Sequence, residues 1–207
     1  MRYLVLTDIH GAAGVLSNAL KYFDQYSCDY LVLLGDLLNH GPRNIITETY
    51  DPPKAIELLN SMGSKIISVR GNCDGEVDSM MFKFQCNAPY ANIIVSDPSG
   101  PDATGRTRSQ RIFLTHGHLH KIDAEDLATA DEMRDSLGLK SGDIVLSGHT
   151  HVAGVFPKKN GLININPGSP TLPKGGTKAG FGLILEDRME IRDMDDNLVD
   201  TYMFKFV

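Results

Sequence analysis

The stretch Arg2-Tyr-Leu-Val-Leu-Thr-Asp-Ile-His-Gly11 joins an apolar run to two side chains that bind metals. Its first six residues form a short, mostly apolar run that is rich in strand formers, and this predicts a buried strand. Beyond Gly11 the apolar residues follow helical spacing. Asp8 and His10 therefore follow the strand at its carboxyl end, where the loops of an α/β sheet line the binding crevice.

Four further apolar runs, at 29–34, 65–69, 111–114 and 143–146, each lead into a polar loop of the same kind. The resulting candidate metal ligands are Asp8, His10, Asp36, Asn72, His116, His149 and His151. Taken singly, each has an ordinary explanation, because Gly-Asp and Gly-Asn pairs are common in turns. Five strand endings in order predict one metal site at one edge of the sheet.

The rest of the chain predicts how the strands are covered. Helices are expected at 53–62, and at 123–137 with Asp123 as N-cap. After His151 the pattern changes to closely spaced short runs at 152–156, 162–165, 181–185, 189–194 and 199–206. They predict a second, largely antiparallel sheet. Helices are too few to cover two separate sheets, so we expect an α/β sandwich with the sheets face to face and helices outside.

Composition narrows the class of protein. The 207 residues show no sharp change of composition, so we expect one domain, 1–207. The 26 acidic against 20 basic residues give a net charge of −6, which argues against strong nucleic-acid binding but allows a small anionic substrate where positive charge is local. Three cysteines, an odd number without C-x-x-C spacing, and no signal-like or membrane-spanning run predict a soluble cytoplasmic protein without a membrane partner.

The residue types indicate two-metal hydrolysis, which needs two nearby cations and a carboxylate able to bridge them. Asp36, in a tight Gly-Asp turn, is the candidate bridge. The amide and imidazole ligands favour two divalent transition-metal ions over Mg²⁺ or Ca²⁺, with Mn²⁺ first and Fe, Zn, Ni or Co as alternatives. Two such cations, two aspartates and a bridging hydroxide leave a charge of about +1, which suits a phosphate ester.

Six motifs in order carry a family resemblance: Asp8-Ile-His-Gly11, Gly35-Asp-Leu-Leu-Asn-His-Gly-Pro-Arg-Asn44, Arg70-Gly-Asn-Cys-Asp74, Thr115-His-Gly-His118, Gly148-His-Thr-His151 and Asn166-Pro-Gly-Ser169. Over essentially its whole length the chain resembles the calcineurin-like metallophosphoesterases, and most closely their bacterial YfcE-type phosphodiesterases. The resemblance implies a four-layer sandwich of two mixed β-sheets with flanking helices. It also implies that Asp8, His10, Asp36 and His151 hold one metal, and that Asp36, Asn72, His116 and His149 hold the other.

One position departs from the superfamily pattern, which commonly has Gly-Asn-His-Asp or Gly-Asn-His-Glu where this chain has Gly-Asn-Cys73-Asp74. In those relatives the histidine is the usual candidate for stabilising or protonating the leaving group. Cys73 is a poorer proton donor, because a thiol near two cations tends toward a thiolate that binds metal or is oxidised. It fits equally well as a small buried space-filler. We therefore expect better rates with activated aryl phosphodiesters than with poor leaving groups.

Several residues near the candidate metal ligands allow two interpretations. Asp74 either orients a ligand or water, or caps a short helix at 76–82. His118 is a candidate contact for substrate phosphate. Arg43, like Asn39 and His40, follows Asp36 closely enough in sequence to reach the site. Arg43 could bind a phosphate there or form a structural salt bridge instead. The polar segment 96–110 is expected to be a hairpin tip rather than a lid, although its arginines offer charge to a substrate.

Together these observations predict a phosphodiesterase that works by attack of a metal-bridged hydroxide, with Asp36, Asn72, Cys73, Asp74 and His118 around the reacting group. The expected partner is a small phosphodiester. A phosphomonoesterase, including a protein phosphatase, is one alternative, and a non-catalytic interaction scaffold of the same fold is another. The closing strands carry Phe181, Met203, Phe204 and Phe206. These side chains fit either internal packing or a homo-oligomer contact.

Overall fold

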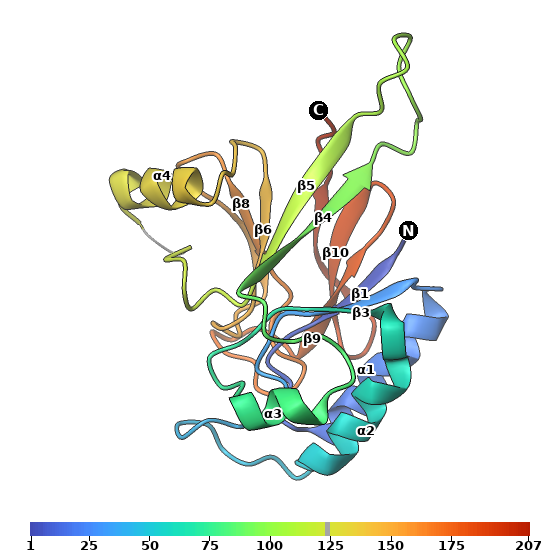
Figure 1. Cartoon of the computed structure of the whole chain (residues 1–207), viewed down its shortest axis with the longest axis vertical. Helices are drawn as coiled ribbons and strands as arrows, with labels where there is room; N and C mark the ends of the chain where they lie inside the picture. The colour runs from blue at the N-terminus through green and yellow to red at the C-terminus, as the bar shows by residue number, and fades with distance from the viewer. Residues whose placement is uncertain (123–124) are drawn as a thin grey trace.

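Two β-sheets pack against each other in the computed structural model, which describes residues 1–122 and 125–207 (Figure 1). The first sheet has the order β11-β10-β9-β1-β2-β3, formed by β1 Tyr3–Leu6, β2 Tyr30–Leu33, β3 Ile66–Ser68, β9 Gly180–Ile184, β10 Arg188–Asp193 and β11 Leu198–Met203. The second has the order β4-β5-β6-β8-β7, formed by β4 Tyr90–Ser96, β5 Ser109–Thr115, β6 Ile144–Leu146, β7 Gly154–Pro157 and β8 Ile163–Asn166. β4 was not expected from the sequence pattern.

Each sheet is mixed. β1, β2 and β3 are parallel, and so are β5, β6 and β8. The remaining pairs are antiparallel. Leu4 of β1 thus lies opposite Leu31 of its parallel neighbour β2 on one side and Leu183 of its antiparallel neighbour β9 on the other. The prediction that the strands after His151 form a sheet of their own is therefore wrong. β7 and β8 extend the second sheet, whereas β9 to β11 extend the first, because strand pairing is decided by neighbours that the local pattern does not reveal.

The helices lie on the outer faces. α1 Ala13–Gln25 and α2 Pro52–Met62, followed by the 3₁₀ turn Gly63–Lys65, cover the first sheet, and α4 Leu127–Ser136 lies beside the second (Figure 1). This confirms the predicted sandwich. Asp126, whose side chain accepts the Thr129 N–H at 2.8 Å, caps α4. The predicted start of this helix, Asp123, lies outside the described residues.

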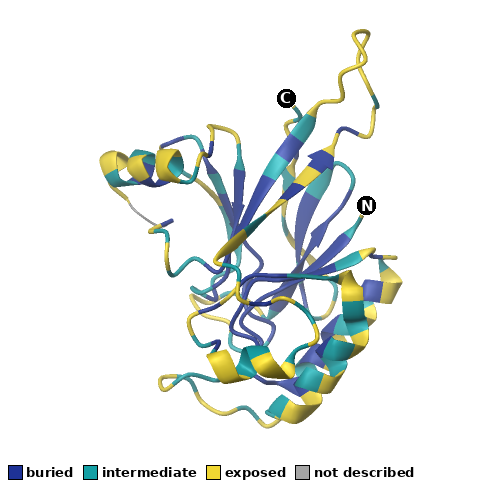
Figure 2. Cartoon of the chain, viewed as in Figure 1, coloured by how far each residue is buried: buried dark blue, intermediate teal, exposed yellow. Residues whose placement is uncertain are grey.

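Three apolar layers hold the sandwich together, and Figure 2 shows the buried strands at its centre. One cluster, including Leu16, lies between the first sheet and helices α1 and α2. A second, with Val5 and Ile112, joins the inner faces of the two sheets, and a third contains Met133 of α4. Among the closing apolar residues, Phe181 and Phe204 pack internally, whereas Met203 is 53% exposed.

The 96–110 segment is the tip of the β4–β5 hairpin, as predicted. It projects away from the end of the molecule where α3 Glu76–Met81 lies (Figure 1). Arg108 pairs with Asp97 at 2.5 Å, and Arg111 pairs with Asp143. Both arginines therefore form structural ion pairs, and these contacts do not support a role of the segment as a lid.

No helix within residues 1–122 and 125–207 has the length and apolar character that crossing a membrane requires.

Candidate metal centre

Five loops converge at the carboxyl ends of β1, β2, β3, β5 and β6. Asp8 and His10 follow β1, Asp36 follows β2, and Asn72 follows β3 in the first sheet; His116 follows β5, and His149 and His151 follow β6 in the second. The sandwich thus brings ligands from both sheets to one place. Asp8, His10, Asp36, His116 and His151 are each at most 2% exposed.

Asp8 lies at the middle of the first group of contacts. Its Oδ1 atom is 3.2 Å from Nε2 of His151 and 3.9 Å from Nε2 of both His10 and His116. This oxygen is buried and has no hydrogen-bond partner. A buried carboxylate oxygen without a donor is costly, so its surroundings suit a cation.

The imidazoles point to the same conclusion. The Nδ1 atoms of His10, His116 and His151 lie 2.6, 2.8 and 2.6 Å from the carbonyl oxygens of Asn39, Leu34 and Leu172, respectively. Each Nδ1 therefore donates its proton outward, so that in its neutral form each imidazole directs the Nε2 lone pair inward. The Nε2 atoms of His10 and His151 face each other at 3.4 Å.

A second set of contacts lies around Asp36. Its Oδ2 atom is 3.5 Å from Nε2 of His116 and 3.9 Å from Nε2 of His10, and its Oδ1 accepts the Cys73 N–H at 2.7 Å. Asn72 joins this set, because its Oδ1 lies 3.0 Å from Nε2 of His116. Asp36 thus stands between the two sets of ligands, where a bridging carboxylate must be.

The donors fit divalent cations. Ligand atoms lie within 4.8 Å of one another in three groups: Asp8 with His10 and His151, Asp8 with Asp36 and His116, and His10 with Asp36 and Cys73. Carboxylate oxygens with neutral imidazoles are ligands that suit transition metals. His149 lies at the edge of these groups, its ring 5.1 Å from that of His116.

Backbone strain is concentrated at the same residues. Asp8, His10, Asp36, His149 and His151 all have positive φ angles, between 50° and 68°. Residues other than glycine enter this left-handed region at a cost of about 1–3 kcal/mol each, and such strain collects at functional sites. The sharp turns aim the side chains at one point instead of letting them alternate along a strand.

Asp74 fixes the loops beneath Asp36. Its carboxylate accepts the backbone N–H groups of Asp36 at 2.9 Å, Leu37 at 2.8 Å and Gly71 at 2.7 Å. Gly75, not Asp74, stands at the N-terminus of α3. The structure therefore favours the positioning role over the helix cap. Gly71 is needed here, because a Cβ atom at this position would collide with Asp36.

The local charges keep both aspartates ionised. Burial disfavours the charged form of Asp8, but the imidazoles of His151 and His116 outweigh it and hold the pKa below its usual value. For Asp36, burial is likewise outweighed by His116 and by the Cys73 N–H, and its pKa is also lowered. Two ionised carboxylates at the centre of buried imidazoles are ready ligands.

The Asn166-Pro-Gly-Ser169 motif, which the sequence left without a role, supports the ligand loops. Ser169 donates its hydroxyl to the carbonyl of Asp8 at 2.8 Å, and its oxygen accepts the Leu172 N–H at 2.8 Å. Asn166 donates to the Gly148 carbonyl at 2.8 Å. The motif ties the loop after β8 to the loops that carry Asp8 and His151.

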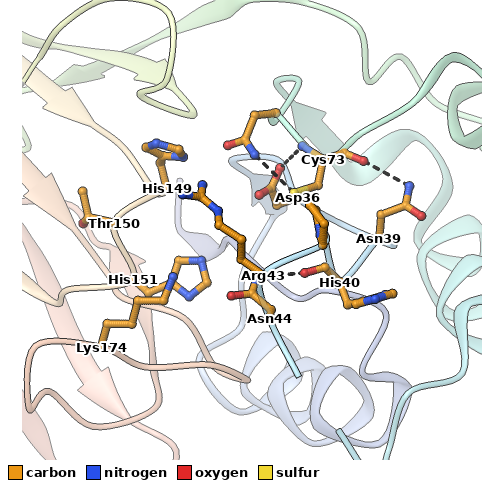
Figure 3. Close-up of a pocket in the computed structure, with 13 residues that line it drawn as sticks. Asp36, Asn39, His40, Arg43, Asn44, Cys73, His149, Thr150, His151 and Lys174 are labelled. Carbon is orange, nitrogen blue, oxygen red and sulfur yellow. Dashed lines mark hydrogen bonds between the residues drawn. The ribbon is translucent and has the colours of Figure 1, made fainter. Parts of the chain in front are cut away.

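The cleft that opens at Asp36 is shown in Figure 3 and has a volume of about 940 Å³. It is lined by Asp36, Asn39, His40, Gly41, Pro42, Arg43, Asn44, Asn72, Cys73, His149, Thr150, His151 and Lys174. Arg43 extends from the loop after β2 toward His149, and Lys174 lies beside His151 (Figure 3). Sequence reasoning missed Lys174, because a lysine in a Pro-Lys-Gly-Gly turn gives no signal of a site.

His118 is placed differently from its prediction. Its ring is 5.3 Å from that of His116, yet it lines a second hollow of about 360 Å³ with Arg70 and Leu119, which shares only Asn72 with the lining of the large cleft. Burial and the neighbouring His116 lower its pKa to about 4. Contact between His118 and a substrate phosphate stays a prediction, and this placement does not favour it.

Cys73 lines the large cleft and is partly buried. Its Sγ accepts a hydrogen bond from the side-chain amide of Asn72 at 3.2 Å. Burial and the Asp36 carboxylate raise the pKa of the thiol to about 12. The side chains around Cys73 therefore favour a neutral thiol, which is a weak proton donor to the leaving group of an ester.

Similar proteins share both the sequence and the fold. The family model described as the calcineurin-like phosphoesterase superfamily domain matches residues 1–188. Phosphodiesterase YfcE of Escherichia coli K12 is 36% identical over 199 residues, which cover 96% of this chain and 95% of that protein. A solved structure of YfcE, described as a phosphoesterase from E. coli, matches with a TM-score of 0.81 and 33% identity, over 99% of this chain and 100% of that one.

A more distant match is the structure of Vps29 from Chaetomium thermophilum, with a TM-score of 0.60 and 15% identity over the whole of both chains. At that identity the likeness concerns the fold alone. The match to the family model and the identity to YfcE agree with the metal-ligand geometry described above. The chain belongs to the calcineurin-like phosphoesterase superfamily.

Proposed function

We propose that this protein is a metal-dependent phosphodiesterase. The observation that carries the proposal is the set of inward-facing ligand atoms: the Oδ1 atom of Asp8 and the Nε2 atoms of His10 and His151 lie together in a buried place, where bound cations would satisfy all three. The 36% identity to a phosphodiesterase over nearly the whole chain supports the choice of a diester as substrate.

Some residues would bind the metals, and others orient these ligands. Asp8, His10, Asp36 and His151 would hold one cation, and Asp36, Asn72, His116 and His149 the other. When bound, two divalent cations supply an acidified water as nucleophile and offset the negative charge that develops at phosphorus. The carbonyls of Asn39, Leu34 and Leu172 keep the imidazoles oriented, and Asp74 holds Asp36 in place.

Manganese is the metal we propose first, with Fe, Zn, Ni or Co as alternatives, because mixed imidazole, amide and carboxylate ligands suit this range of ions. We also propose a cytoplasmic enzyme. Its three cysteines, Cys28, Cys73 and Cys86, are all free thiols, which fits a reducing compartment.

The scaffold alternative draws on the shared fold with Vps29. It is disfavoured, because a scaffold has no use for strained backbone at five ligand positions and for imidazoles held by outward hydrogen bonds. A phosphomonoesterase is the closer competitor, since the same metal ligands serve both reactions.

One experiment separates these alternatives. The protein is stripped of metal with a chelator, manganese is added back, and hydrolysis of bis(p-nitrophenyl) phosphate is compared with that of p-nitrophenyl phosphate. Metal-restored turnover that is faster for the diester supports the proposal. A faster monoester reaction would favour the phosphomonoesterase, and two bound metals without turnover of either ester would favour the scaffold.

A further inference from the structure

The large cleft holds more positive charge than one phosphodiester needs. Arg43 and Lys174 both line it, while Asp36, a candidate metal ligand, is the only carboxylate among its lining residues. Within residues 1–122 and 125–207, neither cation makes a side-chain hydrogen bond or ion pair, whereas Arg108 and Arg111 are paired. In a chain of net charge −6, two unpaired cations facing one cleft form a local positive region.

Hydrogen bonds hold the two segments that carry these cations next to the candidate metal ligands. The N–H of Lys174 donates to the carbonyl of His151 at 3.0 Å, and Thr177 closes the turn by donating to the Lys174 carbonyl. On the other wall, Asn39, which accepts from His10, donates to the Cys73 carbonyl at 3.0 Å. The loop that carries Arg43 is therefore fixed at its base.

The size of the cleft adds to this argument. A volume of about 940 Å³ is near the upper end of the range of small-molecule sites and far exceeds the space of one phosphate group. Figure 3 shows Arg43 and Lys174 reaching in from opposite walls, beside the candidate ligands His149 and His151. The bound molecule thus has room for a second anionic group beyond the scissile diester.

We propose that the cleft selects phosphodiesters that carry a second phosphate group, which Arg43 and Lys174 bind. The inference rests on the proposed phosphodiesterase function and names its substrate class. A guanidinium pairs with phosphate through two parallel hydrogen bonds, and an ammonium acts as a point charge, so the pair suits a dianionic group. Both act on binding rather than on the reacting atoms, and their loss should appear mainly in KM.

The test compares two substrates that share one leaving group: thymidine 5′-(p-nitrophenyl phosphate) and the same compound with a 3′-phosphate. The manganese-loaded protein should prefer the 3′-phosphorylated ester about tenfold in kcat/KM, an advantage that shrinks as salt is added. Arg43→Gln and Lys174→Gln should each lower this preference about threefold, and the double variant should remove it. Arg106→Gln and Lys140→Gln, at exposed sites outside the cleft, should leave it unchanged.

Equal kcat/KM for the two esters in the unaltered protein, or a preference that survives in the double variant, would overturn the inference while leaving phosphodiesterase activity intact. Loss of turnover with both esters would instead contradict the proposed function. In that case calorimetric binding of thymidine 3′,5′-bisphosphate and thymidine 5′-phosphate decides the inference by itself. Tighter binding of the bisphosphate that is lost in the double variant supports it, and equal binding contradicts it.

Discussion

The Nε2 atom of His151 lies 3.2 Å from Oδ1 of Asp8, although the two residues come from loops that follow strands of different sheets. Because His151 donates its Nδ1 proton to the Leu172 carbonyl, its neutral imidazole directs the Nε2 lone pair at the Asp8 carboxylate, so that two acceptors face each other. A cation between them resolves the conflict, and it would also link the two sheets.

Removing the metal should therefore destabilise the fold. At cation concentrations about 100-fold above Kd, bound metal contributes about 2.7 kcal/mol for each site. For a chain of this size, losing both metals should lower the melting temperature by about 11–22 °C. Calorimetric scans with chelator, and after manganese is restored, measure the shift. A melting temperature that does not depend on metal would contradict the metal centre.

Asp36→Asn should abolish turnover, since the change removes the charge of the candidate bridging carboxylate. We expect a fall in kcat of about 10³-fold or more, because losing one electrostatic stabiliser alone costs about 10²–10³. Metal content measured by mass spectrometry should fall together with activity. Asp24→Asn, an exposed change on α1, is the matched control. Near-normal activity with two bound metals in Asp36→Asn would show that Asp36 is not the bridge.

Asp74→Ala should weaken both the fold and metal binding, because it leaves three backbone N–H groups without their acceptor. At about 1–3 kcal/mol for each unsatisfied group, urea unfolding should show a loss of at least roughly 3 kcal/mol. Metal affinity should fall about 10–100-fold, as for other groups that orient ligands. Asp51→Ala, which removes the cap of α2, should lower stability by about 1 kcal/mol without changing metal affinity.

Cys73→His should improve hydrolysis of esters with poor leaving groups. The thiol has a pKa raised to about 12 and lies in the cleft, where an imidazole would be a better proton donor. We expect a larger gain with alkyl than with aryl phosphoesters, measured as the ratio of their kcat/KM values. Cys73→Ser serves as the control for size. A histidine variant without any gain on alkyl esters would argue that Cys73 only fills space.

Asp193 predicts a pH effect away from the site. Lys178 and the N–H groups of Asn197 hold its pKa below the usual value. A carboxyl group with a lower pKa in the folded state adds stability above its unfolded pKa of about 4, and that stability is lost as pH falls below it. In urea unfolding, the difference between the unaltered protein and Asp193→Asn should shrink from pH 6 to pH 3. A constant difference would rule out this linkage.

The sequence by itself determined the elements that carry chemistry. Short apolar runs before Asp8, Asp36, Asn72, His116 and His149 predicted strands that the structure contains, because buried parallel strands have a local apolar signature. The donor types likewise pointed to transition metals without any knowledge of distances. The missed β4 reflects a weaker local signal, because the pairing of an exposed strand depends on its neighbours.

Only the tertiary structure decided which elements pair and which side chains lie together. It assigned β9 to β11 to the first sheet, gave Asp74 three backbone partners, separated His118 from the large cleft and brought Lys174 into it. Each outcome depends on contacts between segments far apart in the chain. Local periodicity reports which face of an element is apolar, but long-range packing selects the element that covers it and the side chains left facing a common space.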